Sequence, residues 1–428
     1  MGRELTRRHA LLFEKRGVKN LVSLFDDLSQ YQKWSELVSF MVWEFLHQLK
    51  LFPRRQYLQF ERSEAVVLNK ERLNSVEFSE KIELFFRNKG LVATTTQPNW
   101  KLLFSTNAGK IYGTQYPDDR ELYRSTDQGE SATFVQRFPE RIKSIFVSSQ
   151  NDIFICIKGA VYKGSHHGAF FEKKMDLGSV ESYFRQNNAM TEMPDQTLWI
   201  GEYGNVWEKR GWRKLAYLYS SQDRGETWQR SDFLIQKGTN KHVHLIKYSP
   251  SFNRLLMADG DNKKKMWITE EINSSFTPNA VQWKPVNKFH IQMGGYTSIV
   301  ESDAKIFFGT DYQGGTNFIV ETTDCEQFTK RIVPDPYRRS PIDNMVLRKS
   351  KNGNEIWANL PYSTPRTKCL LMYTHDGGEN WNKVFEYNRA THKVWLISSA
   401  NESADVVFIS VENTVDQTRL VYKIADRS

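Results

Sequence analysis

The chain has 428 residues, of which 39% are hydrophobic, 25% charged and 13% aromatic. These proportions, with a mean hydropathy of −0.59, exclude a disordered or collagen-like chain and indicate a folded, soluble protein. The 59 Lys and Arg residues outnumber the 50 Asp and Glu residues by 9, which is a mild bias toward acidic partners. The length allows two or three ordinary domains, or one closed repeat fold with a small addition.

The sequence pattern of residues 1–60 predicts a helical segment. Apolar residues at three- and four-residue spacing indicate helices at Arg7 to Arg16, Val18 to Tyr31 and Ser35 to Leu51. The basic N-terminus lacks the apolar core of a secretory signal, and the third helix is too short and too polar to span a membrane. The sequence therefore predicts a cytoplasmic protein whose helices pack on the rest of the chain or on a protein partner.

Residues 61–97 form a predicted connector to the β-rich remainder of the chain. Within it, the run Glu64 to Leu68 has strand-like residues. Residues 392–426 supply only three clear strands, so a strand from before residue 98, of which this run is one candidate, could complete the last sheet of the chain. Such pairing would close a ring of sheets and remove its exposed edges.

A short motif recurs through residues 98–428. Complete copies span Ser221 to Trp228 and Thr374 to Trp381, and degraded copies begin at Ser125 and Thr322. The aspartates of the four copies are Asp127, Asp223, Asp324 and Asp376. Their spacings of 96, 101 and 52 residues imply a repeat of about 50 residues with some copies eroded. In such a turn Asp accepts hydrogen bonds from backbone amides and Gly supplies a positive φ.

The motif resembles the Asp-box, or bacterial neuraminidase repeat, of sialidase-like β-propellers. A 50-residue period suits a four-stranded blade, so the fold class is expected to be all-β, with six or seven blades in residues 98–428. The predicted blades span 98–140, 142–178, 184–238, 242–288, 295–334, 342–388 and 392–426. In families with this box the aspartate is structural, so the resemblance implies that the four box aspartates do not catalyse.

A second resemblance covers Leu198 to Asp311. The motifs Gly201-Glu202-Tyr203, His242-x-His244, Gly260-Asp261 and Gly309-Thr310-Asp311 occur here in that order. They are similar to those of an uncharacterised branch of sialidase-like proteins from bacterial polysaccharide loci. That resemblance implies a glycan ligand without naming a reaction. A true exo-sialidase is disfavoured, because the chain has no Arg-Ile-Pro segment and no clear arginine triad.

Five residues are the predicted catalytic set: Glu202, His242, His244, Asp259 and Asp311. The two histidines are two apart in a strand-like run, so their side chains share one face and could act as acid and base, bind a sugar or ligate a metal. Carboxylates at strand ends could supply the acid and base of glycoside cleavage, one with a pKa raised by burial. Each residue also has a structural alternative, such as capping a turn or satisfying a neighbouring strand.

Four more residues are predicted to bind substrate: Tyr203, Asp261, Trp267 and Tyr296. An indole can stack on the apolar face of a sugar, although most tryptophans of a propeller belong to its core. Because Glu202 and Tyr203 are adjacent, in an extended strand only one of them should face the ligand. No cofactor or metal is expected.

The resulting functional hypothesis is a glycoside hydrolase that acts on an acidic glycan or polysaccharide. One alternative is a non-catalytic propeller that binds a glycan or a protein in polysaccharide assembly. The other is a polysaccharide lyase, in which His or Tyr removes the proton beside a uronate carboxylate. A nucleic-acid partner and a membrane span are not expected. The three cysteines are too few for a disulfide framework, although one disulfide is allowed.

Overall fold

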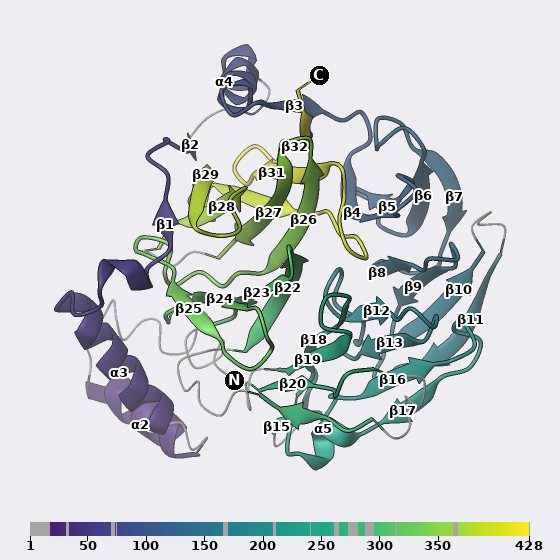
Figure 1. Ribbon diagram of the computed structural model, residues 1–428, viewed down its shortest axis with the longest axis horizontal. Coiled ribbons are helices and arrows are strands. Elements are labelled where there is room, and N and C mark those ends of the chain that lie inside the picture. Colours follow the sequence, from purple (N-terminus) through teal and green to yellow (C-terminus); the bar gives the residue numbers. More distant parts are fainter. Residues whose placement is uncertain are drawn as a thin grey trace.

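The protein is a seven-bladed β-propeller. The computed structural model describes residues 18–30, 34–69, 73, 75–165, 170–208, 211–239, 241–260, 265–272, 281–286, 295–312, 315–362 and 367–427. Within these residues, seven blades, each with four antiparallel strands, surround a central axis, and the sheet of blade six carries two further strands on its outside. Figure 1 shows the ring arrangement. All seven blades lie within the predicted blade ranges, apart from one strand that comes from before residue 98. The sequence left six or seven blades open, and the structure has seven.

The blades are named in chain order, and their strands are given from the central axis outward. Blade one consists of β4 (Trp100–Ser105), β5 (Ile111–Gln115), β6 (Glu121–Ser125) and β7 (Thr133–Arg137). Blade two consists of β8 (Ile142–Val147), β9 (Ile153–Ile157), β10 (Ala160–Gly164) and β11 (Phe171–Asp176). Blade three consists of β12 (Met190–Glu192), β13 (Leu198–Gly201), β16 (Leu218–Ser221) and β17 (Gln229–Ser231). A two-stranded ribbon, β14 (Trp207–Glu208) with β15 (Gly211–Trp212), extends from blade three.

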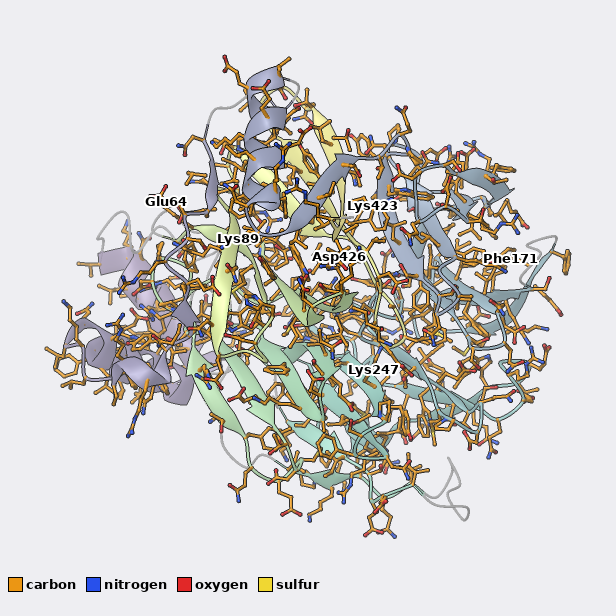
Figure 2. The ribbon with its side chains drawn as sticks, turned by 45° about the horizontal axis from the view of Figure 1, so that its top comes forward. Glu64, Lys89, Phe171, Lys247, Lys423 and Asp426 are labelled. Carbon is orange, nitrogen blue, oxygen red and sulfur yellow. The ribbon has the colours of Figure 1, made fainter. Side chains whose placement is uncertain are left out.

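Blades four to seven continue the ring. Blade four consists of β18 (Val243–Ser249), β19 (Arg254–Asp259), β20 (Met266–Ile268) and β21 (Lys284–Pro285), and blade five of β22 (Tyr296–Ser302), β23 (Lys305–Thr310), β24 (Phe318–Thr322) and β25 (Thr329–Ile332). Blade six consists of β26 (Asn344–Ser350), β27 (Gly353–Leu360), β28 (Cys369–Thr374) and β29 (Asn380–Tyr387). Blade seven consists of β30 (His392–Leu396), β31 (Val407–Asn413), β32 (Arg419–Asp426) and β3 (Leu91–Thr95). Figure 2 shows Lys247, on an innermost strand, toward the middle of the molecule and Phe171, on an outermost strand, at its edge.

The ring closes through β3, which pairs antiparallel with β32 as the outermost strand of blade seven. A strand from residues 61–97 therefore does close the ring, as expected, but it is β3 and not the run Glu64 to Leu68. Val66–Leu68 forms β2 and, with β1 (Gln59–Phe60), pairs parallel with β29 on the outside of blade six. Both runs have strand-like residues. The chain passes along blade six first, where β2 pairs, and reaches blade seven with β3, so β3 completes the last sheet.

Two of the predicted N-terminal helices are confirmed as α2 (Val18–Gln30) and α3 (Trp34–Gln48), while Arg7 to Arg16 lies outside the described residues. A further helix, α4 (Val76–Arg87), was not predicted. Its first turn is capped by the Ser75 hydroxyl, which accepts a hydrogen bond from the Phe78 amide at 3.2 Å. Phe78, Ile82 and Phe86 recur at helical spacing and are buried against blades six and seven. A 3₁₀ turn at Arg54–Gln56 and the short α5 (Phe233–Gln236) complete the helices.

Helix α3 is attached to the propeller through one charged contact and one aromatic contact. The Glu44 carboxylate accepts hydrogen bonds from Arg338 at 2.5 Å and from Arg339 at 2.6 Å. The Trp43 ring packs edge-on against Phe318 of blade five, with centroids 5.5 Å apart. Figure 1 shows α2 and α3 beside β25 at the rim of the ring.

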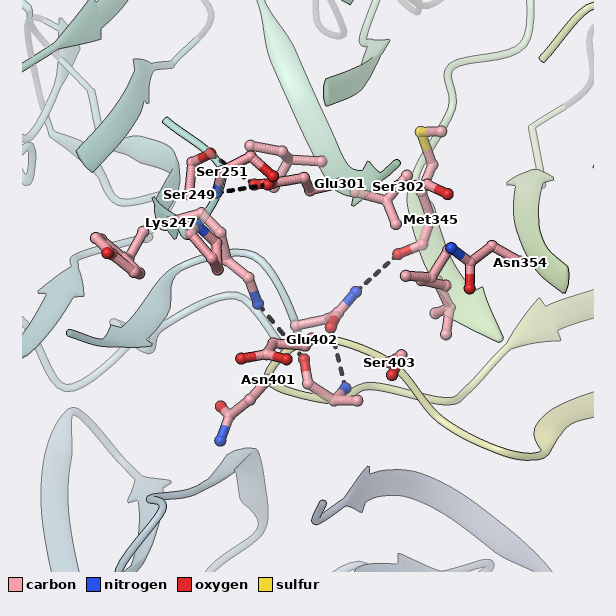
Figure 3. Close-up of a pocket in the computed structure, with 18 of the residues that line it drawn as sticks. Lys247, Ser249, Ser251, Glu301, Ser302, Met345, Asn354, Asn401, Glu402 and Ser403 are labelled. Carbon is pink, nitrogen blue, oxygen red and sulfur yellow. Dashed lines mark hydrogen bonds between the residues drawn. The ribbon is translucent and has the colours of Figure 1, made fainter. Parts of the chain in front are cut away.

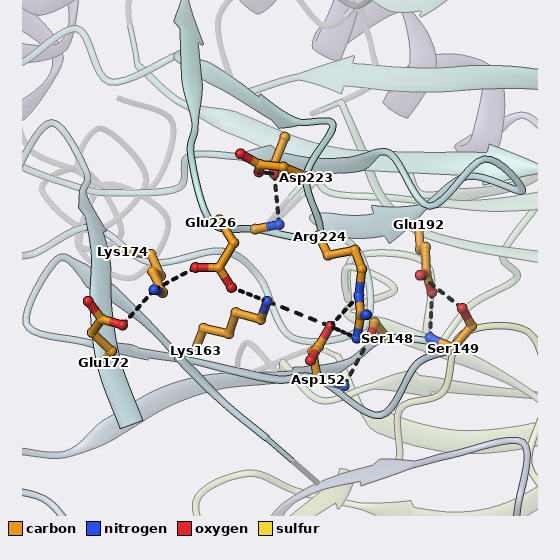
Figure 4. A network of polar contacts seen from close by, with 12 residues as sticks. Ser148, Ser149, Asp152, Lys163, Glu172, Lys174, Glu192, Asp223, Arg224 and Glu226 are labelled. Atoms are coloured by element: carbon orange, nitrogen blue, oxygen red, sulfur yellow. Dashed lines mark hydrogen bonds and ion pairs between the residues drawn. The ribbon is translucent and has the colours of Figure 1, made fainter. Parts of the chain in front are cut away.

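Neighbouring blades adhere through apolar side chains in the middle and ion pairs at the edges. One core cluster joins blades one to three, and another joins blades six and seven with α4. At the edge between blades two and three, Arg224 donates to Asp152 at 2.8 Å, and Glu226 pairs with Lys163 at 2.6 Å and Lys174 at 2.7 Å (Figure 4).

The central channel is crossed by the segment 184–188, which leads into blade three. The Gln186 amide donates to Ser399 at 2.6 Å and accepts from the Ile145 amide at 2.8 Å. The Asn187 amide donates to the Met345 carbonyl at 2.8 Å. The Gln186 amide also donates to the Leu103 carbonyl of blade one at 3.2 Å. This segment therefore ties blades one, two, six and seven together across the channel.

No helix of the described residues is long and apolar enough to cross a membrane. The three cysteines, Cys156, Cys325 and Cys369, are buried and free, so the disulfide that the sequence allowed is not formed.

Candidate functional site

The four repeated motifs form turns of one design between the third and fourth strands of blades one, three, five and six. In blade three, the Asp223 carboxylate accepts hydrogen bonds from the Ser221 hydroxyl at 2.8 Å and the Thr227 amide at 2.9 Å, and the Gly225 amide donates to Ser221 at 2.7 Å. Asp127, Asp324 and Asp376 take the same kind of donors in their own turns. Each carboxylate is engaged within its turn, which fits the expected structural role.

Aromatic side chains lie under these turns, and one of them was not anticipated. The Trp228 indole donates to the Gly225 carbonyl at 3.1 Å. In blade one the equivalent bond to Gly129, 3.0 Å long, comes from Trp100 on the innermost strand. Phe134, which follows that turn in sequence, is 54% exposed. The blade-one motif has no tryptophan at the position of Trp228. Trp100, which is distant in sequence, supplies the indole under that turn instead.

The two predicted histidines meet at the end of the channel where the innermost strands begin. Their Nε2 atoms are 3.0 Å apart, and Nδ1 of His242 is 2.7 Å from the Gly204 carbonyl oxygen. A carbonyl only accepts, so His242 carries a proton on Nδ1; with both rings neutral, its Nε2 accepts and His244 donates. Both rings are buried. The two imidazoles are therefore hydrogen-bonded to each other at the end of the channel where the innermost strands begin.

Tyr203 covers that pair. Its ring centroid is 4.0 Å from that of His242, with 32° between the ring planes, and 5.2 Å from that of Tyr183. The Arg185 guanidinium lies 5.5 Å from the centre of the Tyr203 ring, a cation–π distance. We call the group Tyr183, Arg185, Tyr203, His242 and His244 the histidine mouth.

Arg185 is the functional candidate that sequence reasoning missed. Its Nη2 donates to the carbonyl oxygen of Asp343 at 3.1 Å and to the carboxylate of the same residue at 3.3 Å. Burial lowers the pKa of Arg185, but Asp343, the two tyrosines and Asp311 raise it by more, so the guanidinium stays charged. The sequence carried no signal for this arginine, because it precedes blade three in a segment without a motif.

Asp259 lies next to the histidine pair but is enclosed. Its carboxylate accepts from the Lys265 amide at 2.9 Å, the Thr239 hydroxyl at 3.3 Å and the Trp267 indole at 3.5 Å. Burial raises the pKa of Asp259 to about 6, and these hydrogen bonds and His244 only partly oppose the rise. This carboxyl group therefore changes its protonation near neutral pH.

Glu202 points away from the mouth. Its oxygens accept hydrogen bonds from the Ser182 hydroxyl at 2.5 Å, the Tyr219 hydroxyl at 2.7 Å and the Gly178 amide at 3.0 Å. Burial raises its pKa, and the three donors oppose that rise. Glu202 and Tyr203 therefore face different surroundings, and only Tyr203 contacts the histidines.

The remaining predicted residues are distributed unevenly. Asp311 follows β23 and is partly exposed; its amide donates to the carbonyl of Gly295, a residue adjacent to His244. Trp267 and Tyr296 are 3% and 0% exposed and pack in the cores of blades four and five. Their burial leaves no ring face for a sugar, against the expectation for both. Asp261 lies outside the described residues.

Among the residues that the structure describes, no group of three or more His, Cys, Asp or Glu side chains is placed to hold a metal ion. At the histidine mouth, both Nε2 atoms are already engaged with each other. The arrangement instead places a guanidinium against a tyrosine ring, beside a pair of hydrogen-bonded imidazoles.

Comparison with known proteins supports the fold alone. No protein-family model matches the chain, and no curated protein matches it in sequence. A streptogramin B lyase structure has a TM-score of 0.52 at 14% identity, covering 79% of this chain and 97% of that one. Virginiamycin B lyase from Staphylococcus aureus has a TM-score of 0.51 at 12% identity, covering 78% and 98%. A chain of the mitotic checkpoint complex has a TM-score of 0.50 at 11% identity, covering 78% and 91%.

These neighbours have different functions on one fold, so their activities do not transfer to this chain. The sialidase-like family stays a prediction, since no comparison identifies it.

Proposed function

We propose that the protein binds an acidic carbohydrate at the histidine mouth. The supporting observation is the position of Arg185 against the Tyr203 ring, at 5.5 Å. A guanidinium can pair with a uronate carboxylate, and tyrosine rings can stack on the apolar faces of sugar rings. Among the described residues, both hydrogen bonds that Arg185 donates come from Nη2, so the other edge of the guanidinium faces no described acceptor.

Charge around the mouth supports an anionic ligand. The Lys143 ammonium lies 5.6 Å from the centre of the Tyr183 ring, so a second cation stands beside the same aromatic group, where it also pairs with the exposed Glu181 carboxylate at 3.4 Å. The whole chain has a net charge of +9, which favours encounter with an acidic polymer at low ionic strength.

Binding to polygalacturonate or alginate, with neutral dextran for comparison, tests this proposal. We expect Arg185→Gln to weaken binding of the acidic polymers at least tenfold. Arg224→Gln removes a half-exposed arginine from the outer edge of blade three and should change binding less than twofold. Equal binding of dextran, or equal loss in the two variants, would contradict the proposal.

Cleavage of that carbohydrate by elimination is the second candidate, and the contact of Tyr203 with His242 favours it. A base, Tyr203 or His244, would take the proton beside the uronate carboxylate held by Arg185. The electrons of that C–H bond would form a C=C bond as the glycosidic C–O bond breaks and the leaving oxygen is protonated. Hydrolysis by Glu202 and Asp259 has less support, because both carboxyl groups are engaged by internal donors.

Incubation with the acidic polymers, followed by absorbance near the ultraviolet band of unsaturated uronates and by reducing ends, separates these reactions. Elimination predicts both signals and their loss in Tyr203→Phe or His244→Ala. New reducing ends without absorbance would point to hydrolysis. Neither signal, with binding retained, would leave recognition as the function.

A further inference from the structure

A cavity of about 220 Å³ lies at the opposite end of the channel, where β18, β22 and β26 end. Figure 3 shows its lining, which includes Lys247, Glu301, Met345, Asn354 and Glu402. The segment 184–188 borders this cavity, since Asn187 is bonded to Met345 at 2.8 Å and to the Ala400 amide at 3.2 Å. None of the predicted site residues lines it. We call this cavity the lysine pocket.

The lysine pocket contains a partly buried cation. In the part of the chain that the structure describes, the Lys247 ammonium forms one hydrogen bond, a long one of 3.4 Å to the Ala400 carbonyl, and no ion pair. Burial lowers its pKa to about 8, although Glu402 and Glu301 raise it in part. An ammonium has three donors. Among the described residues, Lys247 uses one of them in a long hydrogen bond, so its other donors remain for a ligand in the cavity.

The nearest carboxylates do not pair with Lys247. Glu301 accepts hydrogen bonds from the Ser249 hydroxyl at 2.6 Å and the Ser251 amide at 2.9 Å. These two contacts turn its carboxylate toward the 249–251 loop, as Figure 3 shows. Glu402 is exposed at the rim. Both act on Lys247 only through space.

The lining also limits the charge of a ligand. Lys247 and Lys349 are its cations, and Glu301, Asp303 and Glu402 are its anions. Two positive and three negative groups give the lining one excess negative charge, which disfavours a dianion such as phosphate, so a single negative charge is accepted only in direct contact with Lys247. Amide and hydroxyl groups of the lining, together with the Glu402 carboxylate, suit a ligand that carries several hydroxyls.

From these contacts we infer that the lysine pocket binds a small hydroxylated monocarboxylate, with its carboxylate on Lys247 and its hydroxyls toward Glu402 and Asn354. The pocket volume of about 220 Å³ is enough for one sugar-acid unit. This site is distinct from the histidine mouth and does not depend on the function proposed for it.

The test uses D-gluconate as the probe, sorbitol as its uncharged counterpart and inorganic phosphate as the dianion, each titrated calorimetrically into the full chain. We expect gluconate to bind at least tenfold more tightly than sorbitol or phosphate. Lys247→Met should weaken the binding of gluconate at least tenfold. Lys349→Met, which removes an exposed cation at the rim, should weaken that binding less than threefold. Arg185→Gln should leave it unchanged, which separates this site from the histidine mouth.

A second measurement avoids any dependence on how the Lys247→Met variant folds. Acylation of the wild-type amines at pH 8, read by peptide mass spectrometry, should be slowed at Lys247 by gluconate and not by sorbitol. Unchanged labelling of Lys247, gluconate affinity equal to that of sorbitol, or full binding by Lys247→Met would each overturn the inference.

Discussion

Arg348 donates two hydrogen bonds of 2.8 Å to the Glu355 carboxylate and a third of 2.8 Å to Asp426. Arg348 and Glu355 belong to blade six, and Asp426 ends β32 of blade seven, so one guanidinium joins the blade that precedes the ring closure to the blade that completes it. The Arg348 side chain is 0% exposed and that of Glu355 is 8% exposed. The pair is therefore a buried ion pair at the closing joint of the ring.

Arg348→Ala should lower the free energy of unfolding by about 3–5 kcal/mol, because it leaves a buried carboxylate without its cation. Urea unfolding followed by tryptophan fluorescence measures this loss. The double variant Arg348→Met with Glu355→Gln should be more stable than Arg348→Ala, since it removes both charges and keeps an acceptor for Trp357, which donates to Glu355 at 2.9 Å. A double variant as unstable as the single one would show that the loss comes from packing.

Asp259 predicts a pH dependence of stability. Its pKa is raised from 3.8 in the unfolded chain to about 6 in the folded protein, mainly by burial. The neutral form is favoured in the folded state, so this contribution is fully present below about pH 4 and is lost as the pH rises through 6. The difference corresponds to about 3 kcal/mol. Asp259→Asn should therefore flatten the stability profile between pH 4 and 7.

The measurement for Asp259 is urea unfolding at several pH values, with Asp26→Asn, an exposed aspartate of α2, as the control. The control should follow the wild-type profile. If Asp259→Asn follows it as well, the carboxyl group does not titrate as its burial implies.

Two adjacent glycines of the blade-six repeat turn give a matched pair of substitutions. Gly377 and Gly378 both have positive φ, 68° and 88°. A Cβ on Gly377 would meet nothing within 4 Å, whereas one on Gly378 would lie 2.7 Å from Cε1 of Phe307 in blade five. Gly377→Ala should cost about 1 kcal/mol from backbone strain alone. Gly378→Ala should cost a further 1–3 kcal/mol, roughly, because it also overpacks the joint between blades.

Thermal and urea unfolding of the two glycine variants measure that difference. Equal losses would mean that Phe307 moves aside and that the turn does not fix the spacing of blades five and six.

Glu44 controls the attachment of the N-terminal helices. Glu44→Ala removes the carboxylate shared by Arg338 and Arg339, and the Arg338 side chain is 4% exposed. Burial acts to raise the pKa of Glu44, but the hydrogen bonds and charges of the two arginines lower it by more, so the carboxylate is ionised in the attached state. We expect trypsin to cleave Glu44→Ala at least fivefold faster at the exposed Arg54 and Arg55, while Asp26→Ala is cleaved at the wild-type rate. Unchanged cleavage would show that the contact of Trp43 with Phe318 is sufficient.

Much of the fold could be predicted from the sequence, because each repeat turn carries its own chemistry. The box aspartates bond to donors within two to four residues, so the pattern of Ser or Thr, Asp and Gly is local and visible in the chain. The strand that closes the ring was not identified because Val66–Leu68 and Leu91–Thr95 have equally strand-like residues. Their partners, β29 and β32, are more than 300 residues away.

The candidate site was predictable only in part. Two histidines on one strand face were expected to meet, and their Nε2 atoms are 3.0 Å apart. The sequence could not show that Glu202 turns to Tyr219, that Trp267 is buried, or that Arg185 reaches Tyr203. Each of these outcomes depends on a residue that is brought close by the packing of strands and blades.

The sequence by itself determined the blade period, the repeat turns and the two helices before the propeller, because those features depend on neighbours in the chain. Only the tertiary structure decided which strand closes the ring, which side chains form the histidine mouth and that Lys247 lines a pocket in which no described residue pairs with it. The physical reason is that burial and charge pairing in a propeller are set between blades, where residues distant in sequence supply the partners.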